Sequence, residues 1–107
     1  MNKINFTGVD FSSLSNLVVV ASDDQISRDL DGEAVILNMK SGVYCGLNEV
    51  GARIWQLIQE PISVGHIRDI LLEEYKVESD LCKKDLLALL QKLTDHGLIE
   101  IKNGKNT

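Results

Sequence analysis

Short runs of alternating apolar and polar residues fill the chain between residues 25 and 47, and turn residues separate them. The runs are Gln25–Leu30, Glu33–Met39 and Val43–Leu47. Asp31-Gly32, between the first two, favours a type I′ turn, because both central positions of that turn need a positive φ. The pattern predicts two successive hairpins and hence three antiparallel strands. Ala34–Leu37 is apolar on both faces, as expected of the central strand.

Helical spacing of apolar residues follows from residue 48 onward, and it predicts three helices. The expected boundaries are Asn48 and Pro61 for the first helix, Ser63 and Tyr75 for the second, and Glu78 or Ser79 and about His96 for the third. Gly97 suits the position just after a helix, where a left-handed residue ends it. The predicted fold is therefore α+β and winged helix-turn-helix-like, with a three-stranded antiparallel sheet followed by three α-helices.

A chain of 107 residues is long enough for one hydrophobic core and too short for two. Residues 17–101 are expected to form the domain, residues 1–16 a flexible N-terminal arm, and residues 102–107 a frayed C-terminal tail. Leu17–Ala21 is β-branched and predicts a further short strand, for which the sequence indicates no partner. Leu98–Ile101 predicts a short extended segment over the core.

The charge of the chain argues against nucleic acid as a partner. The net charge is -5 and the pI is about 4.9, whereas phosphate binding depends on clustered Lys and Arg. Neither a signal peptide nor a run of about 20 apolar residues, as a membrane span requires, is visible. We therefore expect a cytoplasmic protein with no membrane association.

Candidate residues for catalysis or metal binding are few. Cys45 and Cys82 lie far apart without a CxxC motif or an adjacent histidine, so they are expected to be reduced structural thiols. His66 and His96 are the only histidines, and neither has a nucleophile partnered in sequence. The sequence predicts no catalytic residues, no metal site, no cofactor and no enzymatic activity.

The last predicted strand, Val43–Leu47, lies at an edge of the sheet unless Leu17–Ala21 pairs with it. It contains no proline or lysine to discourage pairing, and Gly46 lets another backbone approach closely. An edge of this kind favours the addition of an extended peptide as an extra strand.

The third predicted helix carries more apolar residues than one core-facing stripe needs. Cys82, Leu86, Leu89 and Leu93 have core spacing. Leu87 and Leu90 widen the apolar surface toward a neighbouring face, next to Lys83 and Thr94. This second face either forms one side of a groove or packs against the other helices, and periodicity alone favours neither.

The segments Leu30–Leu37 and Ser41–Trp55 resemble the PqqD-like family of recognition elements for ribosomally synthesised and post-translationally modified peptides (RiPPs). The run Ser41-Gly42-Val43-Tyr44, followed by Leu47-Asn48 and Gly51, is the most specific part. The helical segments Ile67–Tyr75, Asp85–Leu90 and Gly97–Ile99 agree with it. Within the family, the chain looks most like the stand-alone leader-binding proteins of lasso-peptide biosynthesis.

This resemblance implies a non-catalytic protein that binds the leader of a precursor peptide by strand addition and presents it to a modifying enzyme, such as a leader peptidase or another maturase. We also expect a monomer or weak dimer. The implied peptide-binding residues are Val43, Tyr44, Cys45, Gly46 and Leu47 on the strand and Lys83, Leu86, Leu87 and Leu90 on the third helix. Cys45 departs from the family pattern, which usually has an aromatic residue there.

Two other functions are compatible with the predicted elements. A winged-helix transcription regulator would place its recognition helix in a DNA groove. The third helix, however, carries balanced charge: Lys83, Lys84 and Lys92 against Asp80, Asp85 and Asp95. A structural subunit whose groove is filled by a fixed protein partner is the third possibility.

Overall fold

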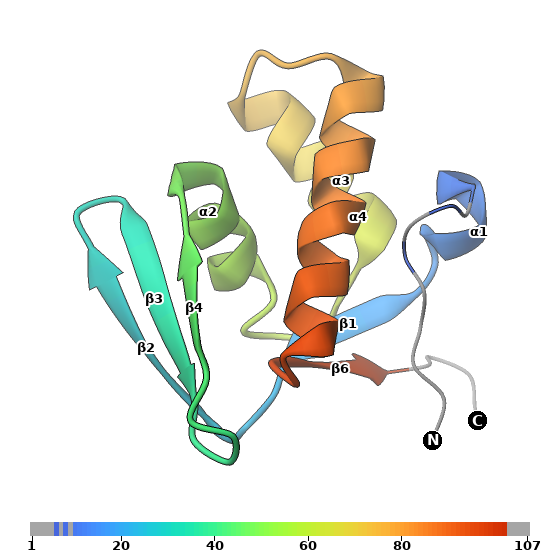
Figure 1. Cartoon of the computed structure of the whole chain (residues 1–107). Helices are drawn as coiled ribbons and strands as arrows, with labels where there is room; N and C mark the ends of the chain where they lie inside the picture. The colour runs from blue at the N-terminus through green and yellow to red at the C-terminus, as the bar shows by residue number, and fades with distance from the viewer. Residues whose placement is uncertain (1–5, 7, 9, 103–107) are drawn as a thin grey trace.

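The computed structural model describes residues 6, 8 and 10–102 and shows two small antiparallel sheets with helices packed against them (Figure 1). The elements in chain order are α1 (Phe11–Leu14), β1 (Val18–Ala21), β2 (Gln25–Leu30), β3 (Glu33–Asn38), β4 (Tyr44–Leu47), α2 (Glu49–Leu57), β5 (Ile62–Ser63), α3 (Val64–Glu74), α4 (Ser79–Asp95) and β6 (Ile99–Lys102). The fold is therefore a mixed α+β fold with antiparallel sheets, in agreement with the predicted class.

One sheet has the order β2-β3-β4, so the two predicted hairpins are confirmed. At the first turn Asp31 has a φ of 57° and Gly32 a φ of 91°, as a type I′ turn requires. The inner face of β3 carries Ala34 and Ile36, both buried against the helices. The central position of β3 thus follows from its apolar sequence.

The second sheet has the order β5-β1-β6 and decides where residues 17–21 pair. β1 pairs antiparallel with β6 over four residues and with β5 over two. The expected order of three strands followed by three helices is therefore incomplete. β1 precedes the hairpins, β5 lies between α2 and α3, and β6 follows α4.

The predicted helix boundaries are confirmed at three points. The side chain of Asn48 accepts a hydrogen bond from the amide of Gly51 at 2.9 Å and so caps α2. The hydroxyl of Ser63 accepts one from the amide of His66 at 3.2 Å and caps α3. Gly97, with a φ of 70°, follows α4 in the left-handed conformation.

Part of the predicted N-terminal arm packs on the domain instead of standing away from it. Phe6 is fully buried, and α1 buries Phe11 and Leu14. The amide of Phe6 donates a hydrogen bond to the side-chain oxygen of Gln91 at 2.6 Å, and the Lys83 ammonium lies 5.7 Å from the Phe11 ring. The helix α1 therefore lies on the side of α4 that faces away from β4 (Figure 1).

The domain limits predicted at residues 17 and 101 stay predictions. Much of the arm, at residues 1–5, 7 and 9, lies outside the described residues, as do residues 103–107 of the predicted tail. Lys102, the first residue of that tail, ends β6. Over residues 6, 8 and 10–102, no helix is both long and apolar enough to cross a membrane.

Leu87 and Leu90 belong to the hydrophobic core, which corrects their predicted place on an open groove. Their exposed fractions are 7% and 0%. The physical reason is the N-terminal segment, whose Phe6 and Phe11 join the same core cluster on this side of α4. The wide apolar stripe of the third helix thus serves packing on two sides.

Replacement of Leu90 by alanine should destabilise the protein by about 2–5 kcal/mol, because it leaves a cavity where a fully buried side chain was. Leu81→Ala is the matched control on the same helix, since Leu81 is 49% exposed and its truncation should cost less than about 1 kcal/mol. Urea unfolding of both variants measures the difference. Equal losses of stability would contradict the core assignment of Leu90.

Candidate functional site

The strand β4 is a free edge of its sheet. It pairs with β3 on one side, and within the described residues no strand pairs with its other side. β1, the one candidate that could have covered it, belongs to the second sheet. The edge predicted from the sequence is therefore present.

The ladder between β3 and β4 shows which main-chain groups of this edge are open. The amide of Asn38 donates to the carbonyl of Val43 at 2.9 Å, which makes these two residues a hydrogen-bonded pair. Such pairs alternate along an antiparallel ladder, so Cys45 and Leu47 also direct their main-chain groups toward β3. The N–H and C=O groups of Tyr44 and Gly46 consequently point to the open side.

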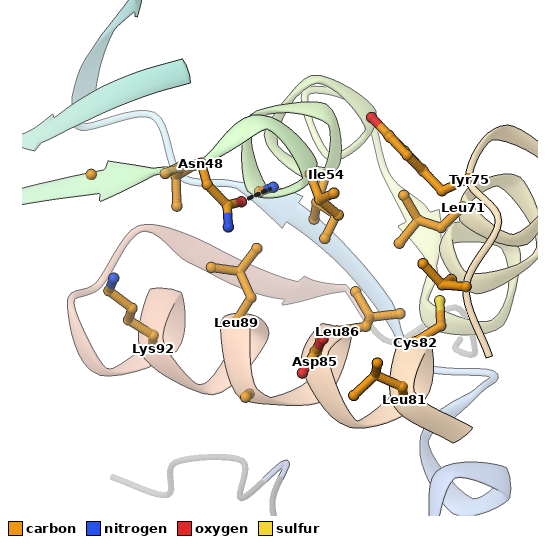
Figure 2. A pocket seen from close by; sticks show the side chains of 16 residues that line it. Asn48, Ile54, Leu71, Tyr75, Leu81, Cys82, Asp85, Leu86, Leu89 and Lys92 are labelled. Atoms are coloured by element: carbon orange, nitrogen blue, oxygen red, sulfur yellow. Dashed lines mark hydrogen bonds between the residues drawn. The ribbon is translucent and has the colours of Figure 1, made fainter. Parts of the chain in front are cut away.

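An apolar groove with a volume of about 460 Å³ lies between this edge, the start of α2, the end of α3 and one side of α4 (Figure 2). We call it the β4–α4 groove. Its lining residues are Gly46, Leu47, Asn48, Val50, Gly51, Ile54, Leu71, Tyr75, Val77, Leu81, Cys82, Asp85, Leu86, Ala88, Leu89 and Lys92. A strand added to β4 would therefore have side chains beneath it as well as hydrogen-bonding groups beside it.

The structure brings three of the nine predicted peptide-binding residues into this groove: Gly46, Leu47 and Leu86. Val43 and Tyr44 are exposed at the start of the strand, outside the groove. The remaining four are Cys45, buried under the sheet, Leu87 and Leu90 in the core, and the partly buried Lys83 beside Phe11. The peptide-binding role of all nine stays a prediction.

The helix residues that the sequence analysis missed lie on the other side of Leu86. At 100° per residue, Leu87 and Leu90 turn to one side of Leu86, whereas Asp85 and Leu89 turn to the opposite side. The signal that could have found them is the mixture of apolar, small and charged residues at positions 81, 85, 88, 89 and 92. A purely apolar stripe on a helix indicates the core, whereas a stripe of apolar residues with a few polar ones is typical of a groove that is open to solvent.

Asn38 connects the sheet to the end of α4 and so holds the two sides of the groove together. Its buried side chain donates to the carbonyl of His96 at 2.6 Å and accepts from the amides of Lys40 and Ser41 at 2.9 and 3.2 Å. The three hydrogen bonds of this buried amide are directional, unlike apolar packing. This contact positions α4 beside β4.

The lining of the groove is mostly apolar and includes a few polar side chains, among them Asn48, Asp85 and Lys92. Asn48 uses its carbonyl oxygen to cap α2, and its NH₂ group points toward the groove (Figure 2). Asp85 and Lys92 are exposed on α4. Among the described residues, no group of three or more His, Cys, Asp or Glu side chains could hold a metal ion. The arrangement suits binding through main-chain hydrogen bonds, apolar contacts and a few charges.

Burial raises the pKa of both thiols above the ordinary value of a cysteine. For Cys45 the ammonium of Lys92 opposes this effect, and for Cys82 the carboxylate of Asp85 adds to it while Arg68 opposes it. Both thiols are therefore protonated at neutral pH and behave as small apolar groups.

The fold is that of the PqqD-like class of small α+β proteins. The family model described as coenzyme PQQ synthesis protein D (PqqD) matches residues 33–99, more than half of the chain. The chain belongs to the PqqD family. None of the curated proteins is significantly similar to it.

Two similar structures are complexes with leader peptides. TbiB1 in complex with the TbiA(beta) leader peptide is 34% identical over 82% of this chain and 99% of that chain, with a TM-score of 0.70. Lasso peptide synthetase B1 complexed with the leader peptide is 27% identical over 77% of this chain and 96% of that chain, with a TM-score of 0.67.

A third similar structure supports the fold alone. It is the PqqD truncation of Methylobacterium extorquens PqqCD, described as a functional and stand-alone RiPP recognition element. It is 18% identical over 91% of this chain and 99% of that chain, with a TM-score of 0.66.

Replacement of Asn38 by alanine should destabilise the protein by about 1–3 kcal/mol, because three main-chain groups lose a partly buried hydrogen bond. Thermal unfolding measures the loss. Ser41→Ala, which removes an exposed hydroxyl bonded to the amide of Val43, is the control and should change little. A stability equal to that of the control would show that the Asn38 contacts do not hold α4.

The two thiols should react with iodoacetamide more slowly in the folded protein than in urea at the same pH, because burial raises their pKa. As the pH rises, the thiols therefore ionise at a lower pH in the unfolded chain than in the folded protein. Their contribution to the free energy of unfolding is therefore complete below about pH 8.5 and is lost as the pH rises through the folded pKa. Rates measured from pH 7 to 10 test this, and equal folded and unfolded profiles would contradict it.

Proposed function

We propose that this protein is a non-catalytic binding protein that captures the leader segment of a ribosomally made precursor peptide as an additional strand along β4 and delivers it to a modifying enzyme. The observation that carries the proposal is the open edge at Tyr44 and Gly46 beside the β4–α4 groove. The leader complexes of the similar proteins support it. They also favour lasso-peptide biosynthesis as the pathway, with a leader peptidase as the enzyme.

The proposed roles follow the geometry of the groove. Tyr44 and Gly46 supply main-chain donors and acceptors, and Leu47 and Leu86 contribute apolar surface under the bound strand. Lys83, Leu87 and Leu90 support α4 from its other side. Leu81, which the sequence analysis did not select, takes the place assigned to Leu87 as an exposed apolar contact.

The magnitudes are adequate for specific binding. Ordering a disordered leader costs about 2–5 kcal/mol, and each buried apolar anchor contributes roughly 1.5–3 kcal/mol. Two or three anchors together with the strand hydrogen bonds give a net free energy of about -8 to -11 kcal/mol, which corresponds to dissociation constants between roughly micromolar and ten nanomolar.

A winged-helix arrangement of the hairpins and helices, and a cytoplasmic location, remain parts of the proposal. DNA binding, the alternative that such an arrangement would allow, is disfavoured by charge. Lys92 is the one basic residue that lines the groove, and Asp85 balances it. The net charge of -5 would in addition repel a phosphate backbone.

Fluorescence-polarisation titration with labelled leader peptides, encoded by precursor genes near the gene of this protein, tests the function. Saturable binding at micromolar concentrations or below, with little change between low and moderate salt, is the expected result. A duplex DNA is titrated in parallel. Absence of binding to every leader, together with salt-sensitive binding to DNA, would replace the proposal by the regulator.

Substitution of Gly46 by proline should weaken leader binding roughly tenfold, because it removes an N–H that points to the open side and places a ring there. Gly46→Ala is the matched control. Its added Cβ meets no atom within 4 Å, and it keeps the N–H. The same titration measures both variants, and equal affinities for the leader would exclude strand addition along β4.

A further inference from the structure

The two charged residues of the β4–α4 groove, Asp85 and Lys92, are separated along α4. Asp85 lies three residues after Cys82, and Lys92 lies ten residues after it. At about 1.5 Å per residue these separations are about 4.5 and 15 Å. Figure 2 shows Cys82 and Leu81 at the end of the groove near Tyr75, and Lys92 at the opposite end. The groove is therefore apolar at one end and positively charged at the other.

Neither Asp85 nor Lys92 forms an ion pair within the part of the chain that the structure describes. The four ion pairs between described residues join Lys40 to Asp24, Arg53 to Glu74, Arg68 to Asp69 and Lys102 to Glu100. Asp85 and Lys92 take part in none of them. Lys92 does lie in the last turn of α4, where a positive charge favours the helix dipole. That effect explains a basic residue near this end of α4 but gives no reason for its place in the groove.

The direction of a bound strand follows from β4. Both sheets of the protein are antiparallel, and antiparallel pairing is slightly more stable than parallel pairing. β4 runs toward Asn48, whereas α4 runs from Leu81 toward Lys92 (Figure 2). A strand antiparallel to β4 therefore enters beside Tyr75 and leaves beside Lys92. Its residues meet the apolar end first, Asp85 next and Lys92 last.

We propose, building on the proposed function, that Lys92 and Asp85 select leaders by the order of charge along the bound strand. The apolar anchor is the leader residue that lies at the apolar end of the groove, beside Cys82. An acidic leader residue lies opposite Lys92, four to five residues after this anchor, since a strand advances about 3.3 Å per residue. Asp85 disfavours an acidic residue one or two positions after the anchor. Lys92 is thus a specificity-determining residue. It distinguishes leaders that share the same apolar anchor.

The test is a charge scan of the leader peptide that binds most tightly in the titration above. Each residue of its strand-forming segment is replaced singly by Glu and by Lys, and every peptide is titrated by fluorescence polarisation. To the wild-type protein, the leader peptide with Glu at a position four to five residues after the anchor should bind about two- to fivefold more tightly than the peptide with Lys there. Moderate salt should reduce this ratio, because the pair is exposed.

Two variants of Lys92 and one control variant test whether Lys92 sets this preference. Lys92→Glu should invert the Glu-to-Lys ratio at that position, and Lys92→Met, which keeps an unbranched apolar stem, should bring it close to one. Lys84→Glu changes the net charge by the same amount on the same helix but lies outside the groove. It should reproduce the wild-type ratio. Thermal unfolding of each variant monitors the fold, so that a loss of stability is not mistaken for a change of preference.

The outcomes separate this inference from the proposed function. A Glu-to-Lys affinity ratio that changes in the Lys92 variants and not in Lys84→Glu supports charge selection. Charge selection is overturned if the Glu-to-Lys affinity ratio at every leader position is the same for the wild type and for Lys92→Glu. If Gly46→Pro still weakens binding in that case, strand addition is unaffected. Absence of saturable binding by any leader overturns the proposed function and this inference with it.

Discussion

The position of α4 relative to β4 is the constraint on which the rest of the structure depends. The helix lies close enough to form one side of a groove, yet it leaves the main-chain groups of Tyr44 and Gly46 uncovered. Apolar packing alone is not directional and would allow α4 to close over the edge. The buried side chain of Asn38, bonded to the carbonyl of His96 and to two amides of the following turn, sets this spacing. An open edge and a filled core are thus combined in one small domain.

The two sides of α4 serve different purposes because different segments cover them. Phe6 and Phe11 from the N-terminal segment pack on one side, where Leu87 and Leu90 are buried. The other side carries Leu81, Asp85 and Lys92 and stays accessible. A small domain has little apolar surface to bury. Phe6 and Phe11 therefore add apolar side chains to the core that the other helices and the two short sheets form. The side of α4 that faces the groove can then remain uncovered without loss of the fold.

Local signals were sufficient for most elements. The positive φ of Asp31 and Gly32, the caps at Asn48 and Ser63, and the left-handed Gly97 all follow from the chemistry of one residue and its near neighbours. The pairing of residues 18–21 with β5 and β6 could not be predicted in this way, because it joins segments about 40 and 80 residues apart along the chain and leaves no local trace. Similarly, nothing near Phe6 or Phe11 in the sequence indicates that α4 is their partner.

The candidate site divides along the same line. The sequence by itself determined a strand at residues 43–47 with a glycine in it, since alternation, turn residues and the lack of proline are local properties. That this strand is an edge was decided by the pairing of residues 18–21 with β5 and β6 instead. The tertiary structure decided which main-chain groups of that strand are open, because a ladder's alternation depends on its partner. It also decided which side of α4 faces the groove. Periodicity defines an apolar stripe but not the segment that covers it. Leu87, expected on the groove, is therefore buried in the core, and Leu81 lines the groove.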